Sequence, residues 1–310
     1  MNILVTGGAG YIGSVLVPML LQNGHDVTVI DNFMYGQTSL LDVCHNQRFH
    51  FIRGDARDRH LLEKHLAGQD VLIPLACLVG APLCDKIPRE AESINRDAVK
   101  LLLSLRTPGQ KVLYPNTNSG YGIGQTDTYC TEETPLAPIS LYGKLKCEAE
   151  QMVLGAGESI VFRLATVFGI SPRMRLDLLV NDFVYRAVHD GFIVLFEADF
   201  KRNYIHVRDV ARAFMHGIAN FEKMKGQAYN VGLSDANFSK RELCAEIQKQ
   251  LPKFYFVEAA LHEDPDKRNY IVSNEKIERT GFRTEVSLTE GVTELIKGYH
   301  IIKRSEFSNI

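Results

Sequence analysis

The sequence has no tryptophan, no Cys-x-x-Cys pair and no glycine/serine-rich linker. Its six cysteines are scattered, which is typical of reduced thiols in a cytoplasmic protein, and a chain of 310 residues does not need disulfides to fold. No apolar run is long enough for a transmembrane helix, and the first residues lack the basic and apolar regions of a signal peptide. We therefore expect a protein of the cytoplasm that does not contact a membrane.

The sequence also lacks an excess of either positive or negative charge. The chain has 35 Lys and Arg residues against 37 Asp and Glu residues, so its formal net charge is only −2. This balance gives no electrostatic reason to expect a nucleic-acid partner, and no residue spacing predicts a metal site. The composition is 45% hydrophobic, which supplies a sizeable core and excludes a disordered chain.

The first half of the chain alternates short β-branched runs with amphipathic segments. The apolar residues of the runs are nearly continuous, as in strands that are covered on both faces. The expected strands are residues 3–6, 27–30, 50–52, 71–75, 111–114 and 159–165. The expected helices are residues 12–22, 59–66, 94–105 and 143–154. This alternation predicts an α/β fold with a doubly wound parallel sheet.

Beyond residue 168 the alternation of expected strands and helices becomes less regular. The expected helices are residues 177–189, 207–220, 240–250 and 288–302, and the expected strands are residues 192–196, 204–207 and 254–257. Because no linker separates two halves, we expect a second, smaller domain that interleaves with the first. The predicted dinucleotide domain spans residues 1–168 and about 202–232, and the predicted C-terminal substrate-binding domain spans about 169–201 and 233–310.

A glycine-rich turn stands between the first expected strand and helix, and it reads Gly7-Gly8-Ala9-Gly10-Tyr11-Ile12-Gly13. The first glycine of such a turn permits a tight bend, the second lets the backbone approach a pyrophosphate, and the third allows close helix–strand packing. The helix start then offers N–H groups to phosphate. Asp31 ends the second strand, where a carboxylate binds an adenosine ribose and repels a 2′-phosphate. Together these features predict NAD, in preference to NADP, on a Rossmann-type sheet.

The glycine motif alone is weak evidence, because glycine turns are common, and Asp31 alone is equally compatible with a capping residue of a turn. Further candidates follow the third and fourth strands at their carboxyl ends, which is where open α/β sheets bind ligands. The residues predicted to contact NAD are Gly7, Gly10, Tyr11, Ile12, Gly13, Asp31, Asn32, Asp55, Ala56, Leu75 and Ala76, together with Tyr142 and Lys146.

Tyr142 and Lys146 are four residues apart, so they lie one above the other on an expected helix. A free tyrosine has a pKa of about 10, which is too high for a base near neutral pH. A close ammonium group stabilises the phenolate, so Tyr142 could remove a hydroxyl proton while Lys146 also holds a ribose. Thr117 follows the fifth strand and faces the same crevice as the glycine turn. A solvated helix face and a polar turn are the alternative interpretations.

In combination, these motifs resemble the extended short-chain dehydrogenase/reductase superfamily, and within it the NAD-dependent nucleotide-sugar epimerases and dehydratases. The resemblance covers essentially the whole chain. Two later segments match the same group, and they read Arg202-Asn203-Tyr204-Ile205-His206-Val207-Arg208-Asp209-Val210-Ala211 and Asp266-Lys267-Arg268-Asn269-Tyr270. The resemblance implies that Tyr142 is the base, that Lys146 is its electrostatic partner and that Thr117 lies beside the reacting oxygen.

The resemblance also implies a nucleotide-diphosphate sugar as substrate. It makes Arg202 and Arg268 ligands of the diphosphate, a role that suits bidentate guanidinium groups, and it makes Asn181 a further candidate. Without the resemblance, surface ion pairs are the simpler interpretation of both arginines. A homodimer packed through the helix of Tyr142 and its neighbour is implied as well.

Two departures from the family pattern narrow the chemistry. Sugar 4,6-dehydratases typically carry Asp and Glu after the threonine, whereas this chain has Asn118 and Ser119, which supply no carboxyl group. The related epimerases that act next to a ketone usually carry a cysteine at the position of Ser119. Both reactions are therefore disfavoured, and Asn118 and Ser119 become candidate substrate ligands. Cys84, in the expected loop 79–84, is either a thiol over the substrate or a simple buried thiol.

What remains is hydride chemistry without elimination, with C4 of the sugar as the favoured position. Release of the keto sugar would make the protein a 4-dehydrogenase, and reduction on the other face would make it a 4-epimerase. Residues 79–84 and 171–175 look most like a subgroup from surface-polysaccharide pathways that includes oxidases of GDP-linked manno-heptose. A GDP-sugar is therefore the favoured substrate. A catalytically silent NAD-binding partner protein is a distant alternative.

Overall fold

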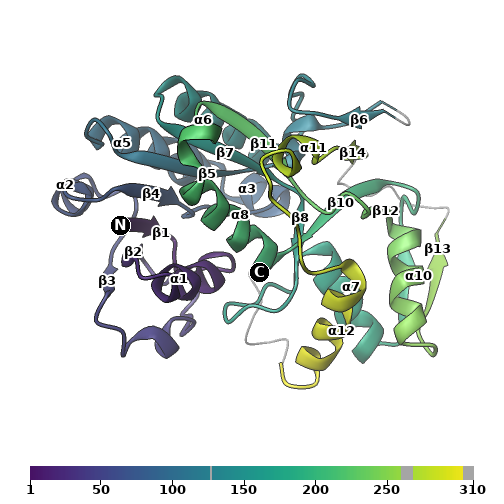
Figure 1. The fold of residues 1–310 in the computed structure, drawn as a ribbon. Helices are drawn as coiled ribbons and strands as arrows, with labels where there is room; N and C mark the ends of the chain where they lie inside the picture. Colours follow the sequence, from purple (N-terminus) through teal and green to yellow (C-terminus); the bar gives the residue numbers. More distant parts are fainter. Residues whose placement is uncertain (126–127, 260–267, 303–310) are drawn as a thin grey trace.

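The computed structural model describes residues 1–125, 128–259 and 268–302. In this part of the chain, seven parallel strands form a central sheet in the order β11-β7-β5-β4-β1-β2-β3 (Figure 1). The strands are β1 (Asn2–Thr6), β2 (Asp26–Asp31), β3 (Phe49–Arg53), β4 (Val71–Pro74), β5 (Lys111–Thr117), β7 (Ser159–Leu164) and β11 (Gln227–Val231). The chain leaves β1 toward β2 on one side and returns to β4 on the other, so the predicted doubly wound α/β fold is confirmed.

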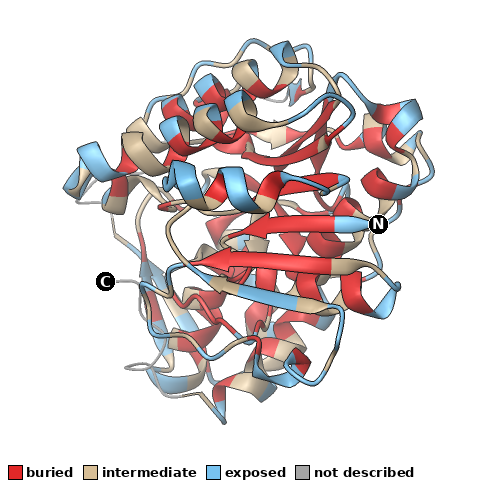
Figure 2. Cartoon of the chain, turned by 90° about the vertical axis from the view of Figure 1, so that its left-hand side faces the viewer, coloured by how far each residue is buried: buried red, intermediate tan, exposed pale blue. Residues whose placement is uncertain are grey.

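Helices cover both faces of this sheet, which explains the nearly continuous apolar strands. Ile3 and Val5 of β1 belong to one core, whereas Leu4 between them belongs to the opposite core. The first core is closed by α1 (Gly13–Gln22) and α8 (Val207–Ala219). The opposite core is closed by α2 (Arg59–Leu66), α5 (Ala98–Leu105) and α6 (Leu141–Gly155). Figure 2 shows the inner strands buried and the edge strand β3 largely exposed.

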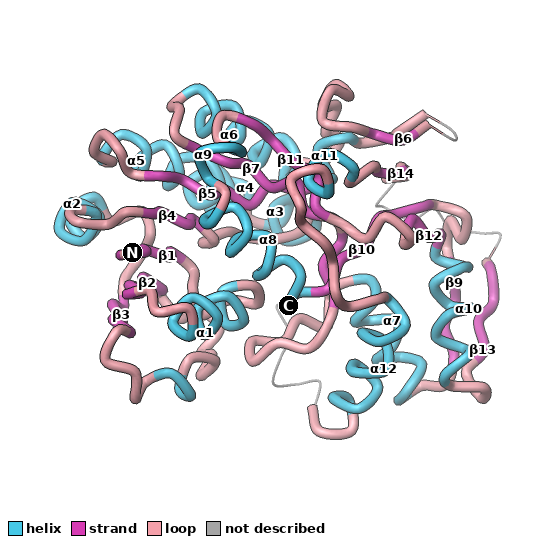
Figure 3. Tube along the Cα trace, viewed as in Figure 1, coloured by secondary structure: helices cyan, strands magenta, loops and turns pink. Residues whose placement is uncertain are grey.

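A second core lies beside the sheet and is formed mainly by residues after 166 (Figure 3). Its helices are α7 (Leu179–His189), α10 (Lys240–Gln250) and α12 (Leu288–Tyr299). Its strands are β8 (Thr166–Phe168), β10 (Lys201–His206) and β12 (Asn237–Ser239) in one small sheet, and β9 (Phe192–Leu195) and β13 (Tyr255–Glu258) in another. Tyr11 of the glycine-rich turn packs into this core, so the two halves of the molecule meet at that turn.

Two local predictions need correction. Residues 94–105 do not form one regular helix, because α4 (Pro88–Glu92) runs through a π-helical turn, η2 (Ser93–Asp97), into α5. Asn95 lies in that turn, and its buried amide binds both the N–H and the carbonyl oxygen of Leu78, at 2.8 Å each. Residues 79–84 are not a loop throughout, because α3 (Ala81–Lys86) starts there after Gly80 at φ +101°.

Sequence patterns do not predict the shortest helices and strands, because a segment of two to four residues is too short to show a hydrophobic period. They are β6 (Tyr129–Cys130), β14 (Ile271–Val272), α9 (Phe221–Met224), α11 (Glu275–Glu278), η1 (Leu41–Val43) and η3 (Asn118–Tyr121). Within the described ranges, no helix is both long enough and apolar enough to cross a bilayer.

A buried ion pair joins α6 to the sheet. The Arg163 guanidinium on β7 donates from Nη2 and Nε to the Glu150 carboxylate on α6, at 2.6 and 3.2 Å, and both side chains are less than a tenth exposed. The same carboxylate accepts a hydrogen bond from the Asn116 amide on β5. Arg163 also donates to the Tyr121 hydroxyl at 3.0 Å. The Glu150 carboxylate thus holds α6, β5 and β7 in fixed positions relative to one another.

We expect Glu150→Ala to lower the free energy of unfolding by about 3–5 kcal/mol, because it leaves the Arg163 charge buried and unpaired. Glu148→Ala is the matched control on the same helix, since Glu148 is half exposed and meets Arg96 at 3.5 Å. Its cost should stay below about 1 kcal/mol. Urea unfolding followed by circular dichroism measures both values, and equal losses would contradict the structural role of the buried pair.

Candidate active site

The glycine-rich turn forms a cradle that only small residues can build. Gly7 has a φ of +72°, and a Cβ atom on it would lie 2.5 Å from the backbone nitrogen of Ala76 at the end of β4. A Cβ atom on Gly13 would lie 2.4 Å from the carbonyl oxygen of Gly8. Among the described residues, no side chain caps the start of α1, so its backbone N–H groups can serve an anion. This cradle fits the pyrophosphate of a dinucleotide.

Asp31 lies at the end of β2 directly above this turn. Its Oδ2 accepts a hydrogen bond from the Ala9 N–H at 3.0 Å, and its Oδ1 accepts one from the Phe33 N–H at 2.8 Å. Burial raises the pKa of Asp31, while the two N–H groups lower it. The carboxylate is therefore held rigidly where the sequence predicts contact with an adenosine ribose.

Asp55 and Asn32 lie next to each other at the ends of β3 and β2. A hydrogen bond from Arg57 is the main cause that lowers the pKa of Asp55, and Asn32 adds a further one. A small apolar pocket opens beside them, lined by Ala56, Ala76, Val99 and Leu102 among others. The sequence did not single out Val99 and Leu102, because their helical spacing indicates only a core position.

Tyr142 and Lys146 lie on α6, whose start is capped by Ser140 accepting from the Gly143 N–H at 3.1 Å. Lys146 is buried, and its Nζ lies 4.0 Å from the centre of the Tyr114 ring. Burial lowers the pKa of Lys146, and the nearby Cys77 and Glu150 raise it. Burial raises the pKa of Tyr142 well above its ordinary value, against the opposite influence of Arg175 and Arg268.

Thr117 ends β5, and Asn118 and Ser119 follow it at the start of η3. The Thr117 hydroxyl accepts from the Ser119 N–H at 3.1 Å and donates to the Ser119 hydroxyl at 3.0 Å. Asn118 is buried, and neither atom of its amide has a hydrogen-bond partner among the described residues. Arg268 donates to the Ser119 hydroxyl. The structure thus brings Tyr142, this polar trio and Arg268 into one neighbourhood.

Arg202 is also buried, on β10. Its guanidinium lies 5.5 Å from the centre of the Tyr270 ring and donates to the Lys201 carbonyl oxygen at 3.0 Å. Arg268 precedes Tyr270 by two residues, so both predicted phosphate ligands come close to this residue, Arg202 in space and Arg268 in sequence. Residues 266 and 267 of the same sequence motif lie outside the described residues.

Two predicted substrate ligands have other surroundings. The Cys84 thiol is fully buried, donates to the Leu78 carbonyl oxygen at 3.3 Å and packs with Leu145, which matches the alternative of a structural thiol. Asn181 is fully buried too. Its Oδ1 accepts from the Gly169 N–H at 3.0 Å, and its Nδ2 donates to the Arg175 carbonyl oxygen at 2.8 Å and the Tyr11 hydroxyl at 3.3 Å. These bonds use its amide within the protein and make it a scaffold residue here.

Two groups that the sequence did not assign lie close to the chemistry. Cys77 follows Ala76 and is the first neighbour, after burial, that perturbs the pKa of both Tyr142 and Lys146. Arg175 is buried and lies near Tyr142 and Tyr11. The signal available for Arg175 was a pair of arginines, Arg173 and Arg175, in an otherwise apolar segment.

Comparison with known proteins agrees with this geometry. The chain is 28% identical to UDP-glucuronic acid decarboxylase 1 of Arabidopsis thaliana over 96% of its length and 70% of that protein. It is 29% identical to a UDP-glucose 4-epimerase of Corynebacterium glutamicum, covering 89% of this chain and 88% of the relative. A dTDP-glucose 4,6-dehydratase of Streptomyces venezuelae, solved with NAD bound, superimposes with a TM-score of 0.85 at 25% identity over 97% of both chains.

The model of the NAD dependent epimerase/dehydratase family matches residues 3–232, which include the glycine cradle, Asp31 and the Tyr142 helix. The relatives perform several different reactions on nucleotide sugars, so the match defines the class of enzyme and leaves the individual reaction open. The chain belongs to the NAD dependent epimerase/dehydratase family, and its cofactor is NAD.

Proposed function

We propose that this enzyme oxidises the C4 hydroxyl of a nucleotide-diphosphate sugar, with GDP-manno-heptose as the favoured substrate. The observation that carries the proposal is the set of side chains around Tyr142. A base, a lysine and a threonine are present for removal of a proton, while the two positions after the threonine hold Asn118 and Ser119. Neither residue supplies the carboxyl group that elimination of water requires.

The proposed reaction uses the side chains of this chain for the proton and NAD, when bound, as the hydride acceptor. The Tyr142 phenolate takes the proton of the C4 hydroxyl as the carbon–oxygen double bond forms and the C4 hydrogen leaves as hydride. Lys146 and Arg175 stabilise the phenolate by charge. Thr117 donates a hydrogen bond to the reacting oxygen and holds it in line with the base.

Two arginines, of which Arg202 is buried and Arg268 half-buried, are proposed to hold the diphosphate of the substrate. Arg202 and Arg268 approach the crevice from the second half of the chain, and guanidinium groups bind phosphate oxygens in pairs. Arg268 reaches the Ser119 hydroxyl in this structure, which places it next to the polar trio. The unpartnered amide of Asn118 is then available for a sugar hydroxyl.

A 4-epimerase is the second candidate, because the Corynebacterium relative carries that name at 29% identity. The same side chains would serve, provided that the keto sugar turns over before it is reduced again. The preference for GDP and for a surface-polysaccharide pathway comes from residues 79–84 and 171–175, and the homodimer from the family resemblance. Both stay predictions.

A panel of nucleotide sugars tests the reaction. With GDP-manno-heptose and excess NAD, we expect a keto sugar to accumulate with one NADH formed per sugar oxidised. The products are followed by mass spectrometry and by absorbance at the NADH band. A stereoisomer without net change in the cofactor would instead establish the epimerase, and loss of water would contradict both proposals.

Tyr142→Phe should lower turnover about 10²- to 10⁴-fold, because it removes the proton acceptor. The variant should still fold and bind NAD, since only one oxygen atom is lost. Because burial raises the pKa of Tyr142, the rate of the unmodified enzyme should rise with pH through the neutral range as the phenolate forms. Tyr129→Phe, at an exposed position, is the matched control and should leave kcat and its pH profile unchanged.

Asp31→Asn should reduce the preference for NAD over NADP by at least about tenfold, because the amide no longer repels a 2′-phosphate. The amide keeps an oxygen that can accept from the Ala9 or the Phe33 N–H, so the turn should survive. Asp26→Asn, at the other end of β2, is the control. Titration calorimetry with both cofactors measures the ratio, and an unchanged ratio would show that Asp31 does not select the cofactor.

A further inference from the structure

Residues 169–177, here called the arginine strap, connect β8 to α7 and lie against the first turn of α1. The Ser171 hydroxyl donates to the Tyr11 carbonyl oxygen at 2.7 Å and lies 2.8 Å from the Ser14 hydroxyl. The Tyr11 hydroxyl donates to the Gly169 carbonyl oxygen at 2.7 Å. The Arg173 N–H reaches the Ser14 hydroxyl at 3.4 Å. These bonds fix the strap to the element that carries the glycine-rich turn.

The strap is anchored equally well on its other side. Asn181 of α7 binds the strap at both ends, through the Gly169 N–H at 3.0 Å and the Arg175 carbonyl oxygen at 2.8 Å. Its own carbonyl oxygen accepts from the Tyr299 hydroxyl of α12 at 2.8 Å. The position of the strap relative to α1 is therefore set by two helices of the second core.

Two arginines of the strap are buried between these layers, with Arg173 only 5% and Arg175 only 9% exposed. The Arg173 guanidinium lies 4.6 Å from the centre of the Tyr35 ring, in the loop after β2. The Arg175 guanidinium binds the Asp177 carboxylate through Nε, at 3.1 Å, and through Nη2. Its third nitrogen, Nη1, remains free for another acceptor as far as the described residues show.

The neighbours of the two side chains locate them along the crevice. Tyr35 is tied to the Asp31 end, because the Gln37 side chain accepts from the Tyr35 N–H at 3.2 Å and donates to Asp31 at 3.4 Å. Burial raises the pKa of Tyr35, and Arg175 and Arg173 lower it. Arg175 also lowers the pKa of Tyr142 at the reactive end. The Asn181 amide binds both the Arg175 carbonyl oxygen and the Tyr11 hydroxyl, so Arg175 lies at the level of the glycine-rich turn.

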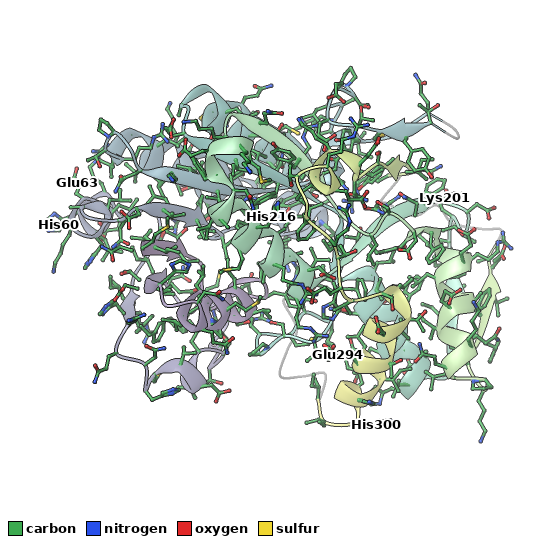
Figure 4. All side chains as sticks on the ribbon, viewed as in Figure 1. His60, Glu63, Lys201, His216, Glu294 and His300 are labelled. Atoms are coloured by element: carbon green, nitrogen blue, oxygen red, sulfur yellow. The ribbon has the colours of Figure 1, made fainter. Side chains whose placement is uncertain are left out.

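The strap brings two buried guanidinium groups close to each other. Burial lowers the pKa of Arg173 and Arg175 lowers it further, while Asp177, which binds Arg175, raises it. Arg173 also donates to the Met174 carbonyl oxygen. A further acidic group at the strap is Glu294 of α12 (Figure 4), which accepts from the Ile170 N–H at 3.3 Å. Glu294 is already paired with Arg208 at 2.6 Å. An anion at Nη1 of Arg175 would therefore be stabilised by a buried guanidinium group, with that of Arg173 nearby.

We propose that Arg173 and Arg175 bind the pyrophosphate of NAD from the side opposite the glycine-rich turn. The turn and the α1 N-terminus supply backbone N–H groups on one side, and the strap supplies two charged donors from the second half of the chain on the other. This role depends on the cofactor alone and not on which sugar the enzyme oxidises. It also explains why the two arginines are buried beside α1 and not at the surface.

Binding to protein freed of nucleotide tests the proposal without any turnover. Arg173→Gln and Arg175→Gln should each weaken NAD and ADP-ribose roughly 10- to 100-fold, as loss of a charge-assisted hydrogen bond predicts. Adenosine, which has no phosphate, should bind all forms within about twofold. Lysine at either position should retain part of the affinity, which keeps the test valid if a glutamine variant unfolds. The constants are measured by titration calorimetry at a fixed salt concentration.

Arg186→Gln is the matched control, because Arg186 lies on α7 close to the strap in sequence, is half exposed and pairs with Asp182 at 2.9 Å. It should bind NAD like the unmodified protein. If the Arg173 and Arg175 variants lost affinity for adenosine as much as for NAD, the two arginines would only support the fold of the crevice. Unchanged NAD affinity together with weaker GDP binding would assign them to the substrate diphosphate. Either result would overturn the proposal.

Discussion

The close approach of β1 and β4 at their carboxyl ends is the constraint on which the site depends. Gly7 and Ala76 lie backbone against backbone there, with no room for a side chain on Gly7. Because β1 continues toward β2 on one side and β4 lies on the other, the loops part above this contact and leave a crevice. The strands β2, β3, β4 and β5 end at the same height as β1. The edge of the crevice is therefore lined by residues at or just after these strand ends, namely Asp31, Ala56, Cys77 and Thr117.

The helix α6, which carries Tyr142, needs a second constraint, since a crevice does not position a helix. Glu150 lies two turns beyond Tyr142 on α6, and its buried carboxylate binds Arg163 of β7 and Asn116 of β5. A buried carboxylate without these donors would be unstable, so α6 can settle only where all of them reach it. The register of α6 against the sheet then sets the height of Tyr142 relative to Thr117. The ion pair thus fixes the position of Tyr142 relative to the sheet.

Local patterns encode much of this site. The glycine turn, Asp31 and the Tyr142–Lys146 spacing could be identified because each depends on neighbours in sequence and on the level at which a strand ends. Asn181 and Cys84 could not be placed this way. The Asn181 amide binds Tyr11, which lies 170 residues away, and the Cys84 thiol is covered by α6. Their surroundings follow from how the second core docks on the first, and no short window of sequence contains that information.

The packing of the second core against the first also explains how a chain with a net charge of −2 can bind anionic ligands. Total charge acts over the whole surface, where salt screens it within about 10 Å. Arg173, Arg175 and Arg202 are buried, so their charges act at short range in a medium of low dielectric constant. Burying such groups costs free energy that a bound anion returns. A ligand that binds only the folded chain raises its stability, so we expect the protein to be more stable with its nucleotide bound.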